Sequence, residues 1–182
     1  AAFKKSKEGA RLLRQSTDEL ALRGYTELAQ ELAKIPDLAA IFLPASSGTT
    51  TEGLYQGFKQ SKLQVPQIHI AQTPNCHPLV SAIYAQLQRE LPTTNVSEPS
   101  LASSIVDVVA HRTTTVTTAV IESGGNGWVI TNKEIVAAQE LVKKHTDIDI
   151  STTSALSIAA LQQALATGWK PIGAVVCLIT GA

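Results

Sequence analysis

The pattern of apolar and polar positions predicts short buried strands that alternate with amphipathic helices. Apolar residues recur at helical spacing over 25–35, and Pro36 ends that predicted helix. The apolar run 38–43 predicts a buried strand, and a second helix is expected to run to about residue 62. In that helix Gly53 and Gly57 lie four residues apart, which predicts close packing against a neighbouring element.

The central part of the chain is less uniform. Residues 66–72 predict a second strand, and 77–91 predict a helix with a proline near its start, where proline is tolerated. Residues 104–110 fit a strand or a loop. Residues 113–123 are ambiguous, because their β-branched side chains favour a strand while their flanks suit a helix.

The signals sharpen toward the end of the chain. Thr131 and Glu134 form a capping box that opens a helix over 132–145. A further helix is expected to stop at Gly168. Its predicted inward-facing residues are Leu156, Ala160, Ala164 and Leu165. The continuously apolar run 171–181 predicts a last strand covered on both faces, with Cys177 as a core residue.

Strands that alternate with helices predict an α/β domain with a mainly parallel sheet and helices on both faces. We expect this domain to span residues 20–182, after a basic leader at 1–19. The chain is long enough to bury the core of one such domain.

Charge and composition exclude several classes of protein. The formal net charge is +0, so no electrostatic argument favours a nucleic acid or a membrane surface as partner. No apolar stretch approaches the roughly 20 residues of a membrane span. Two cysteines make neither a disulfide framework nor a metal cluster, and the spacing of Cys76 and His77 fits no specific ligand pattern. A cytoplasmic protein without a metal site is therefore expected.

Candidate chemistry lies in the stretch "FLPASSGTTTEG", where a hydroxyl-rich loop joins the predicted strand 38–43 to the next helix. The first N–H groups of a helix are unpaired, and the helix dipole favours a negative charge there. The candidate anion-binding residues are Ser46, Ser47, Gly48, Thr49 and Thr50. The loop is neither a P-loop nor a dinucleotide fingerprint, and helix capping alone would also explain its residues.

The order of segments resembles the pyridoxal-phosphate enzymes of the tryptophan synthase β-like fold, closest to threonine synthases. The likeness covers about residues 20–182 and rests on "SSGTTTEGLYQGF", "IESGGNGWVITNKEIVAAQELVKK", "ISTTSALSIAALQQA" and "VVCLITG". It implies that residues 46–50 wrap the phosphate of pyridoxal 5'-phosphate. Serine at 46 and threonine at 49 depart from the more glycine-rich loops of that family.

The same resemblance implies that the Thr180 hydroxyl hydrogen-bonds the pyridine nitrogen of the cofactor. A neutral partner there leaves the ring unprotonated, which favours elimination and replacement over transamination. The implied reaction converts O-phosphohomoserine to threonine and phosphate, with a small amino-acid substrate and a homodimeric enzyme. A threonine or serine dehydratase, a β-replacement enzyme of the same fold and a non-catalytic anion-binding domain are the alternatives.

The sequence offers no candidate for the catalytic lysine of this family. Schiff-base chemistry needs a lysine amine, and the family carries it in an S-x-K-D-like motif in its amino-terminal half. The lysines of this sequence lie on solvent-facing helix positions or in the basic leader, so we predict no catalytic residue. Because the sequence also lacks methionine, we expect the chain to be the carboxyl-terminal portion of a larger enzyme and inactive alone.

Other titratable residues suggest structural roles. His69 lies in a predicted strand and is expected at the core or at a sheet edge. His111 and Arg112 could face an anionic substrate, but a surface pair is the preferred interpretation. Trp128 and Trp169 are expected to be packing residues, and Thr153 and Ser154 either cap a helix or touch cofactor or substrate.

Overall fold

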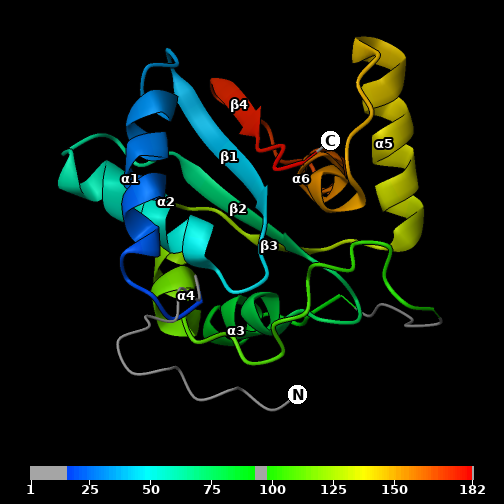
Figure 1. Cartoon of the computed structure of the whole chain (residues 1–182), viewed down its shortest axis with the longest axis horizontal. Helices are drawn as coiled ribbons and strands as arrows, with labels where there is room; N and C mark the ends of the chain where they lie inside the picture. Colours follow the sequence, from blue (N-terminus) through cyan, green and yellow to red (C-terminus); the bar gives the residue numbers. More distant parts are fainter. Residues whose placement is uncertain (1–15, 93–97, 182) are drawn as a thin grey trace, which may run out of the picture.

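The computed structural model describes residues 16–92 and 98–181, which form a sheet between two layers of helices (Figure 1). Residues 1–15 of the predicted leader lie outside the described part. The elements in chain order are α1 Ala21–Leu32, β1 Leu38–Pro44, α2 Thr49–Gln60, β2 Gln67–Gln72, α3 Pro78–Gln86, α4 Thr113–Glu122, β3 Gly127–Val129, α5 Asn132–Thr146, α6 Thr152–Ala166 and β4 Ala174–Cys177.

The four strands form one parallel sheet in the order β3-β2-β1-β4, so the predicted fold class is confirmed. β1 lies between β2 and β4, with Phe42 opposite His69 on one side and opposite Cys177 on the other. Because the strands are parallel, the loops that follow β1, β2 and β4 emerge at the same edge of the sheet. Ligand sites of open α/β folds are found at this edge.

The side chains of β1 point alternately to the two faces of the sheet, so the core has two layers. Ile41 and Leu43 point into the cluster formed with α1, α2, α3 and α4. Ala40 and Phe42 point into the opposite cluster, which α5 and α6 cover. Since side chains of a strand alternate between its two faces, a central strand covered by helices on both faces must be apolar at nearly every position.

Two glycines let α1 lie close against α2. A Cβ atom added at Gly53 would lie 2.5 Å from the Tyr25 Cβ, and one added at Gly57 would lie 2.6 Å from the Ala29 Cβ. The helices could not approach this closely with larger residues at either position. The prediction of close packing at these glycines is confirmed.

The structure shows which conformation each of the two ambiguous segments adopts. Residues 113–122 form α4, with Val116, Ala119 and Val120 buried against the sheet. Burial of one helical face therefore outweighs the β-propensity of the threonines. Residues 101–110 contain turns and bends but no strand. The capping box of Thr131 and Glu134 at the start of α5 is confirmed.

Three predictions of burial are wrong. β4 is half-buried along its length rather than covered on both faces, because among the described strands it pairs only with β1. Cys177 is accordingly half-buried, although burial still raises the pKa of its thiol to about 12. Leu165 is 49% exposed, while Leu156, Ala160 and Ala164 face inward as predicted. Among the described residues, no helix is long and apolar enough to cross a membrane.

Candidate functional site

The loop that follows β1 lines a hollow of about 150 Å³ at the carboxyl edge of the sheet. Its lining runs from Pro44 to Thr51 and contains no charged side chain. Gly48 is the N-cap of α2 and has a left-handed φ of 87°, and no side chain caps this helix end. The first N–H groups of α2 have no carbonyl partner within the helix, so the hollow presents donors and the positive end of a helix dipole.

A buried hydroxyl adds independent support for a ligand in this hollow. Thr51 lines it and is fully buried, and its Oγ1 atom has no hydrogen-bond partner among the described residues. Buried hydroxyls in native structures nearly always have a partner. A phosphate oxygen accepts hydrogen bonds from N–H and O–H groups, and the hollow has room for a group the size of several water molecules. The residues present therefore fit a phosphate group. The sequence interpretation stopped at Thr50 and missed Thr51.

The predicted hydroxyl residues do not all have the same surroundings. Ser47 Oγ and Thr49 Oγ1 lie 3.0 Å apart and share a hydrogen bond. Ser46 Oγ donates to Asp107 Oδ2 at 3.0 Å, and it accepts from the backbone N–H of Val106 at 3.2 Å. The proton of the Ser46 hydroxyl is thus directed to a carboxylate, which leaves this residue its backbone N–H for an anion.

Gln72 fixes the loop to its neighbours, and sequence reasoning missed it. This side chain at the end of β2 is fully buried. Its Nε2 donates to the Ala45 carbonyl at 2.9 Å, and its Oε1 accepts from the N–H groups of Leu79 and Val80 at the start of α3. One amide therefore satisfies the open end of α3 and holds the first residue of the loop. The signal in the sequence was a glutamine at the end of a predicted strand.

Thr180 lies in the segment that follows β4, next to β1 at the same edge of the sheet. Its side chain is exposed, and its backbone N–H donates to Ser154 Oγ at 3.1 Å. Ser154 is fully buried and also donates to the Gly181 carbonyl at 2.7 Å. The N-cap of α6 is Ser151, so Ser154 anchors the Thr180 segment rather than the helix end.

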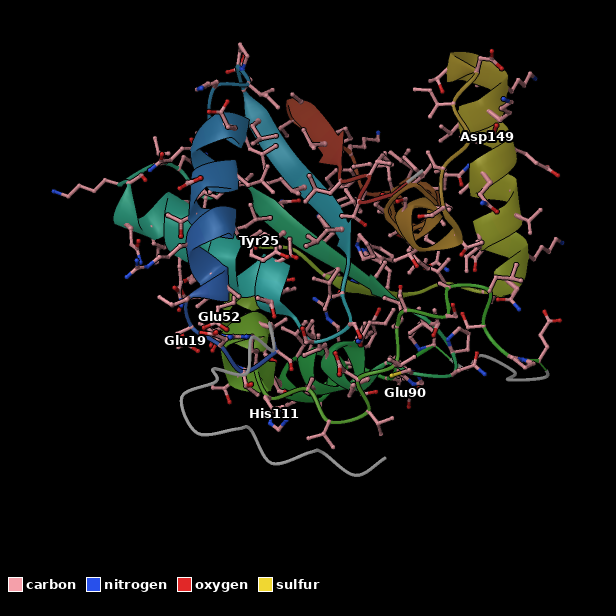
Figure 2. All side chains as sticks on the ribbon, viewed as in Figure 1. Glu19, Tyr25, Glu52, Glu90, His111 and Asp149 are labelled. Carbon is pink, nitrogen blue, oxygen red and sulfur yellow. The ribbon has the colours of Figure 1, made fainter. Side chains whose placement is uncertain are left out.

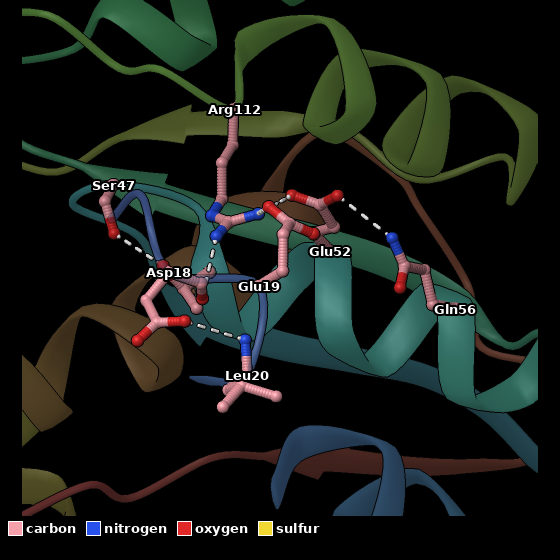
Figure 3. A network of polar contacts seen from close by, with 8 residues as sticks. Asp18, Glu19, Leu20, Ser47, Glu52, Gln56 and Arg112 are labelled. Carbon is pink, nitrogen blue, oxygen red and sulfur yellow. Dashed lines mark hydrogen bonds and ion pairs between the residues drawn. The ribbon is translucent and has the colours of Figure 1, made fainter. Parts of the chain in front are cut away.

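The surface interpretation of Arg112 is wrong, whereas His111 is exposed. Arg112 is only 5% exposed, and its Nη1 donates to Glu52 Oε2 at 2.7 Å and to Glu19 Oε1 at 3.1 Å (Figure 3). Figure 2 shows the two carboxylates side by side beneath α1. Burial alone would lower the pKa of Arg112, but the hydrogen bond and charge of Glu52 and the charge of Glu19 raise it above its ordinary value. Glu52 and Glu19 therefore both stabilise the positive charge of this buried arginine.

A buried aromatic cluster lies on the α6 face of the sheet. His69 stacks on Phe42 with ring centroids 4.3 Å apart, and Trp169 packs edge-on against both rings. Trp128 Nε1 donates to His69 Nδ1 at 3.3 Å, which places the ring proton on Nε2, toward Gln67. Burial lowers the pKa of His69 to about 4. His69 is thus a neutral core residue, and the predicted packing roles of the two tryptophans are confirmed.

Every lysine in the described part of the chain is exposed, and none lines the loop hollow. These residues are Lys34, Lys59, Lys62, Lys133, Lys143, Lys144 and Lys170. A Schiff-base lysine is normally desolvated or placed beside another cationic group. None of these lysines has such surroundings.

Comparison with known proteins identifies the family. The chain belongs to the family described as pyridoxal-phosphate dependent enzyme, whose profile matches residues 1–181. It is 29% identical to a threonine synthase of Methanosarcina acetivorans over 93% of this chain and 44% of that protein. It is 26% identical to the threonine synthase of Methanocaldococcus jannaschii over 97% of this chain and 45% of that protein. The chain thus spans less than half the length of these relatives.

Solved structures share the fold at lower identity. The processed form of threonine deaminase isoform 2 from Solanum lycopersicum superimposes with a TM-score of 0.70 at 18% identity, over 91% of this chain and 46% of that one. Serine racemase from Dictyostelium discoideum gives a TM-score of 0.68 at 20% identity, over 90% of this chain and 50% of that one. The architecture is that of the tryptophan synthase β-like fold.

Proposed function

We propose that this chain supplies the cofactor-phosphate and pyridine-ring contacts of a threonine synthase-like enzyme, which converts O-phosphohomoserine to threonine and phosphate. The observation that carries the proposal is the hollow at the start of α2, with its buried, unpartnered Thr51 hydroxyl. The threonine synthase relatives support the choice of reaction.

In this proposal the residues of the loop hold the phosphate without a cation. Ser47, Gly48, Thr49 and Thr50 offer N–H and O–H donors at the helix end, and Thr51 adds its hydroxyl. Each donor or dipole contributes on the order of 1 kcal/mol. After the cost of immobilising the ion, free phosphate is expected to bind at about millimolar Kd, or about −4 kcal/mol.

Thr180 is proposed to donate its hydroxyl proton to the pyridine nitrogen. Its segment follows β4 at the same sheet edge as the phosphate loop, and Ser154 holds the backbone of this segment to α6, which supports the proposed role. When bound, the cofactor supplies an electron sink for bond cleavage at the amino-acid substrate. A neutral hydroxyl at the ring nitrogen moderates that sink, which suits elimination and replacement.

The catalytic lysine is proposed to lie in a further part of the enzyme, which would also supply most contacts to the amino-acid substrate. The complete enzyme would be a homodimer. A β-replacement reaction is the second candidate, because the chain is also 28% identical over 126 residues to a cysteate synthase of Methanocella paludicola.

An NMR titration with inorganic phosphate tests the loop. Shifts centred on residues 46–51 are expected in the wild-type chain. Thr51→Val removes the unpartnered hydroxyl at nearly constant shape, so it should weaken binding about fivefold while leaving the free chain equally stable or more stable. Thr180→Ala is the matched control and should leave phosphate binding unchanged. Shifts confined to exposed lysines would mean that the hollow does not bind phosphate and would contradict the proposal.

Two further assays test the enzyme. Borohydride reduction with pyridoxal phosphate should give no single stoichiometric pyridoxyl adduct on any lysine of this chain. Threonine release from O-phosphohomoserine is expected only when the chain is combined with a separately expressed amino-terminal half of a threonine synthase. Turnover by this chain alone would overturn the assignment of the lysine to another part of the enzyme.

A further inference from the structure

The segment that follows β4 is held to the start of α6 by three serines (Figure 1). Ser151, Ser154 and Ser157 lie three residues apart, and all three contact the backbone of this segment. Ser157 Oγ donates to the Leu178 carbonyl at 3.1 Å, and the Ser151 N–H donates to the Gly181 carbonyl at 3.2 Å. Beyond Leu178 the described residues of the segment are exposed, so hydrogen bonds rather than apolar burial fix its path.

Ser154 holds the backbone on both sides of Thr180. Its Oγ accepts from the N–H of Thr180 at 3.1 Å and from the N–H of Gly181 at 3.0 Å. These two N–H groups belong to the peptide units that flank the Thr180 Cα. Ser154 is fully buried in α6, so its oxygen has a fixed place. Since the backbone has only two soft dihedrals per residue, two bonds to one fixed atom restrict the direction in which the Thr180 side chain leaves the chain.

Hydrogen-bond capacity distinguishes the hydroxyls of Ser154 and Thr180 as partners for a ring nitrogen. A hydroxyl has one proton to donate. Ser154 donates its proton to the Gly181 carbonyl at 2.7 Å, and its Oγ also accepts from the Ser151 hydroxyl at 2.9 Å. Thr180 is exposed, and its hydroxyl has no hydrogen-bond partner among the described residues. Thr180 can therefore donate to an unprotonated ring nitrogen, whereas the proton of Ser154 is already used.

We propose that Ser154 is the positioning residue for Thr180, and that it gives the site its selectivity for a ring that carries a nitrogen acceptor. This inference rests on the proposed cofactor site. A hydrogen bond weakens steeply as its angle departs from linearity, so a donor on an unrestrained backbone would form it only part of the time. None of the hydrogen bonds of the Ser154 side chain involves residues 46–51, so Ser154 acts on the ring contact and not on the phosphate contact.

Two small phosphate esters measure this selectivity. The phosphate esters of nicotinyl alcohol and of benzyl alcohol differ only in the ring nitrogen, and neither carries an aldehyde that could react with the exposed lysines. At neutral pH the pyridine nitrogen is unprotonated. One net hydrogen bond predicts that the wild-type chain binds nicotinyl phosphate about fivefold more tightly than benzyl phosphate. Ser154→Ala should make the two affinities nearly equal, while inorganic phosphate should bind as it does to the wild-type chain.

Ser157→Ala is the matched control. It removes a hydroxyl that is also fully buried in α6 but contacts Leu178 instead of Thr180, so the selectivity should remain. Thr180→Val removes the donor itself and should abolish the selectivity. Adding Ser154→Ala to Thr180→Val should then change nothing further, because Ser154 acts through Thr180. A merely structural role of Ser154 would weaken the binding of both esters and of inorganic phosphate alike.

The readout is an NMR titration of each chain with the two esters and with inorganic phosphate, followed at residues 46–51 and at Thr180. Loss of the selectivity in Ser154→Ala, with inorganic phosphate binding retained, supports the proposal. Retained selectivity in this variant, or equal weakening of all three ligands, overturns the positioning role and leaves the ring contact standing. Equal binding of the two esters by the wild-type chain overturns the ring contact and this inference together, while inorganic phosphate reports on the phosphate loop separately.

Discussion

A methyl group at Gly48 should destabilise the fold through two separable effects. Gly48 has a φ of 87°, where a residue with a Cβ atom costs about 1–2 kcal/mol. The added Cβ would also lie 2.4 Å from the Val116 Cγ2 of α4, which forces a shift costing about 1–3 kcal/mol. Gly48→Ala is therefore expected to lower the free energy of unfolding by about 2–5 kcal/mol.

A double-mutant cycle separates the clash from the backbone strain. Val116 is fully buried, and Val116→Ala alone should cost about 1–3 kcal/mol through lost burial and a cavity. In the double variant the missing methyl groups make room for the new Cβ, while the strain at φ remains. The double variant should therefore be more stable than the sum of the single effects predicts, by about 1–3 kcal/mol.

Urea unfolding of the four chains, followed by circular dichroism, measures the cycle. Equal slopes of free energy against urea would show that the unfolded states are comparable. Strictly additive losses of the free energy of unfolding would show that the added Cβ does not clash with Val116. Loss of less than about 1 kcal/mol in Gly48→Ala would show in addition that the left-handed conformation is not required.

Two further predictions concern buried polar groups. His69 has a pKa of about 4 in the folded chain and about 6.5 when unfolded, so the unfolded state binds the extra proton as pH falls. The contribution of His69 to the free energy of unfolding should be complete above about pH 6.5 and should fall by about 3 kcal/mol down to pH 4. In urea titrations at several pH values, His69→Phe should lose less stability over this range than the wild-type chain. The same pH profile in both chains would contradict the prediction. Gln72→Leu leaves the N–H groups of Leu79 and Val80 and the Ala45 carbonyl without their partner. The variant should therefore lower the free energy of unfolding by about 3 kcal/mol or more and shift the NMR signals of the loop. A loss below about 1 kcal/mol would show that these groups find other partners.

The layered fold could be predicted from the sequence because its signals are local. The apolar run of β1 and the capping box of Thr131 and Glu134 each lie within a few residues, and both act through the backbone beside them. The hydroxyl loop is equally local, so its position between a strand and a helix was predictable. Its role as a phosphate site stays a prediction.

The partners of the loop were not predictable, because they come from distant parts of the chain. Ser46 meets Asp107 across 61 residues, and Arg112 meets Glu52 across 60. Neither pair follows a periodic pattern. Arg112 looked like a surface cation because its burial depends on two acids supplied by α2 and by the turn before α1. Such pairings are fixed by the tertiary fold.

The order of the strands has a consequence for how the sheet opens. β1 is hydrogen-bonded on both sides and carries fully buried residues on both faces, whereas β4 pairs with β1 alone among the described strands and is half-buried. Amide protons of β4 should therefore exchange with deuterated solvent through local fraying, and those of β1 only through global unfolding. Thr180 follows β4, so its segment is attached to the least protected strand of the sheet. Ligand binding would then order the Thr180 segment, proposed to contact the pyridine nitrogen, to a greater extent than it orders the phosphate loop after β1.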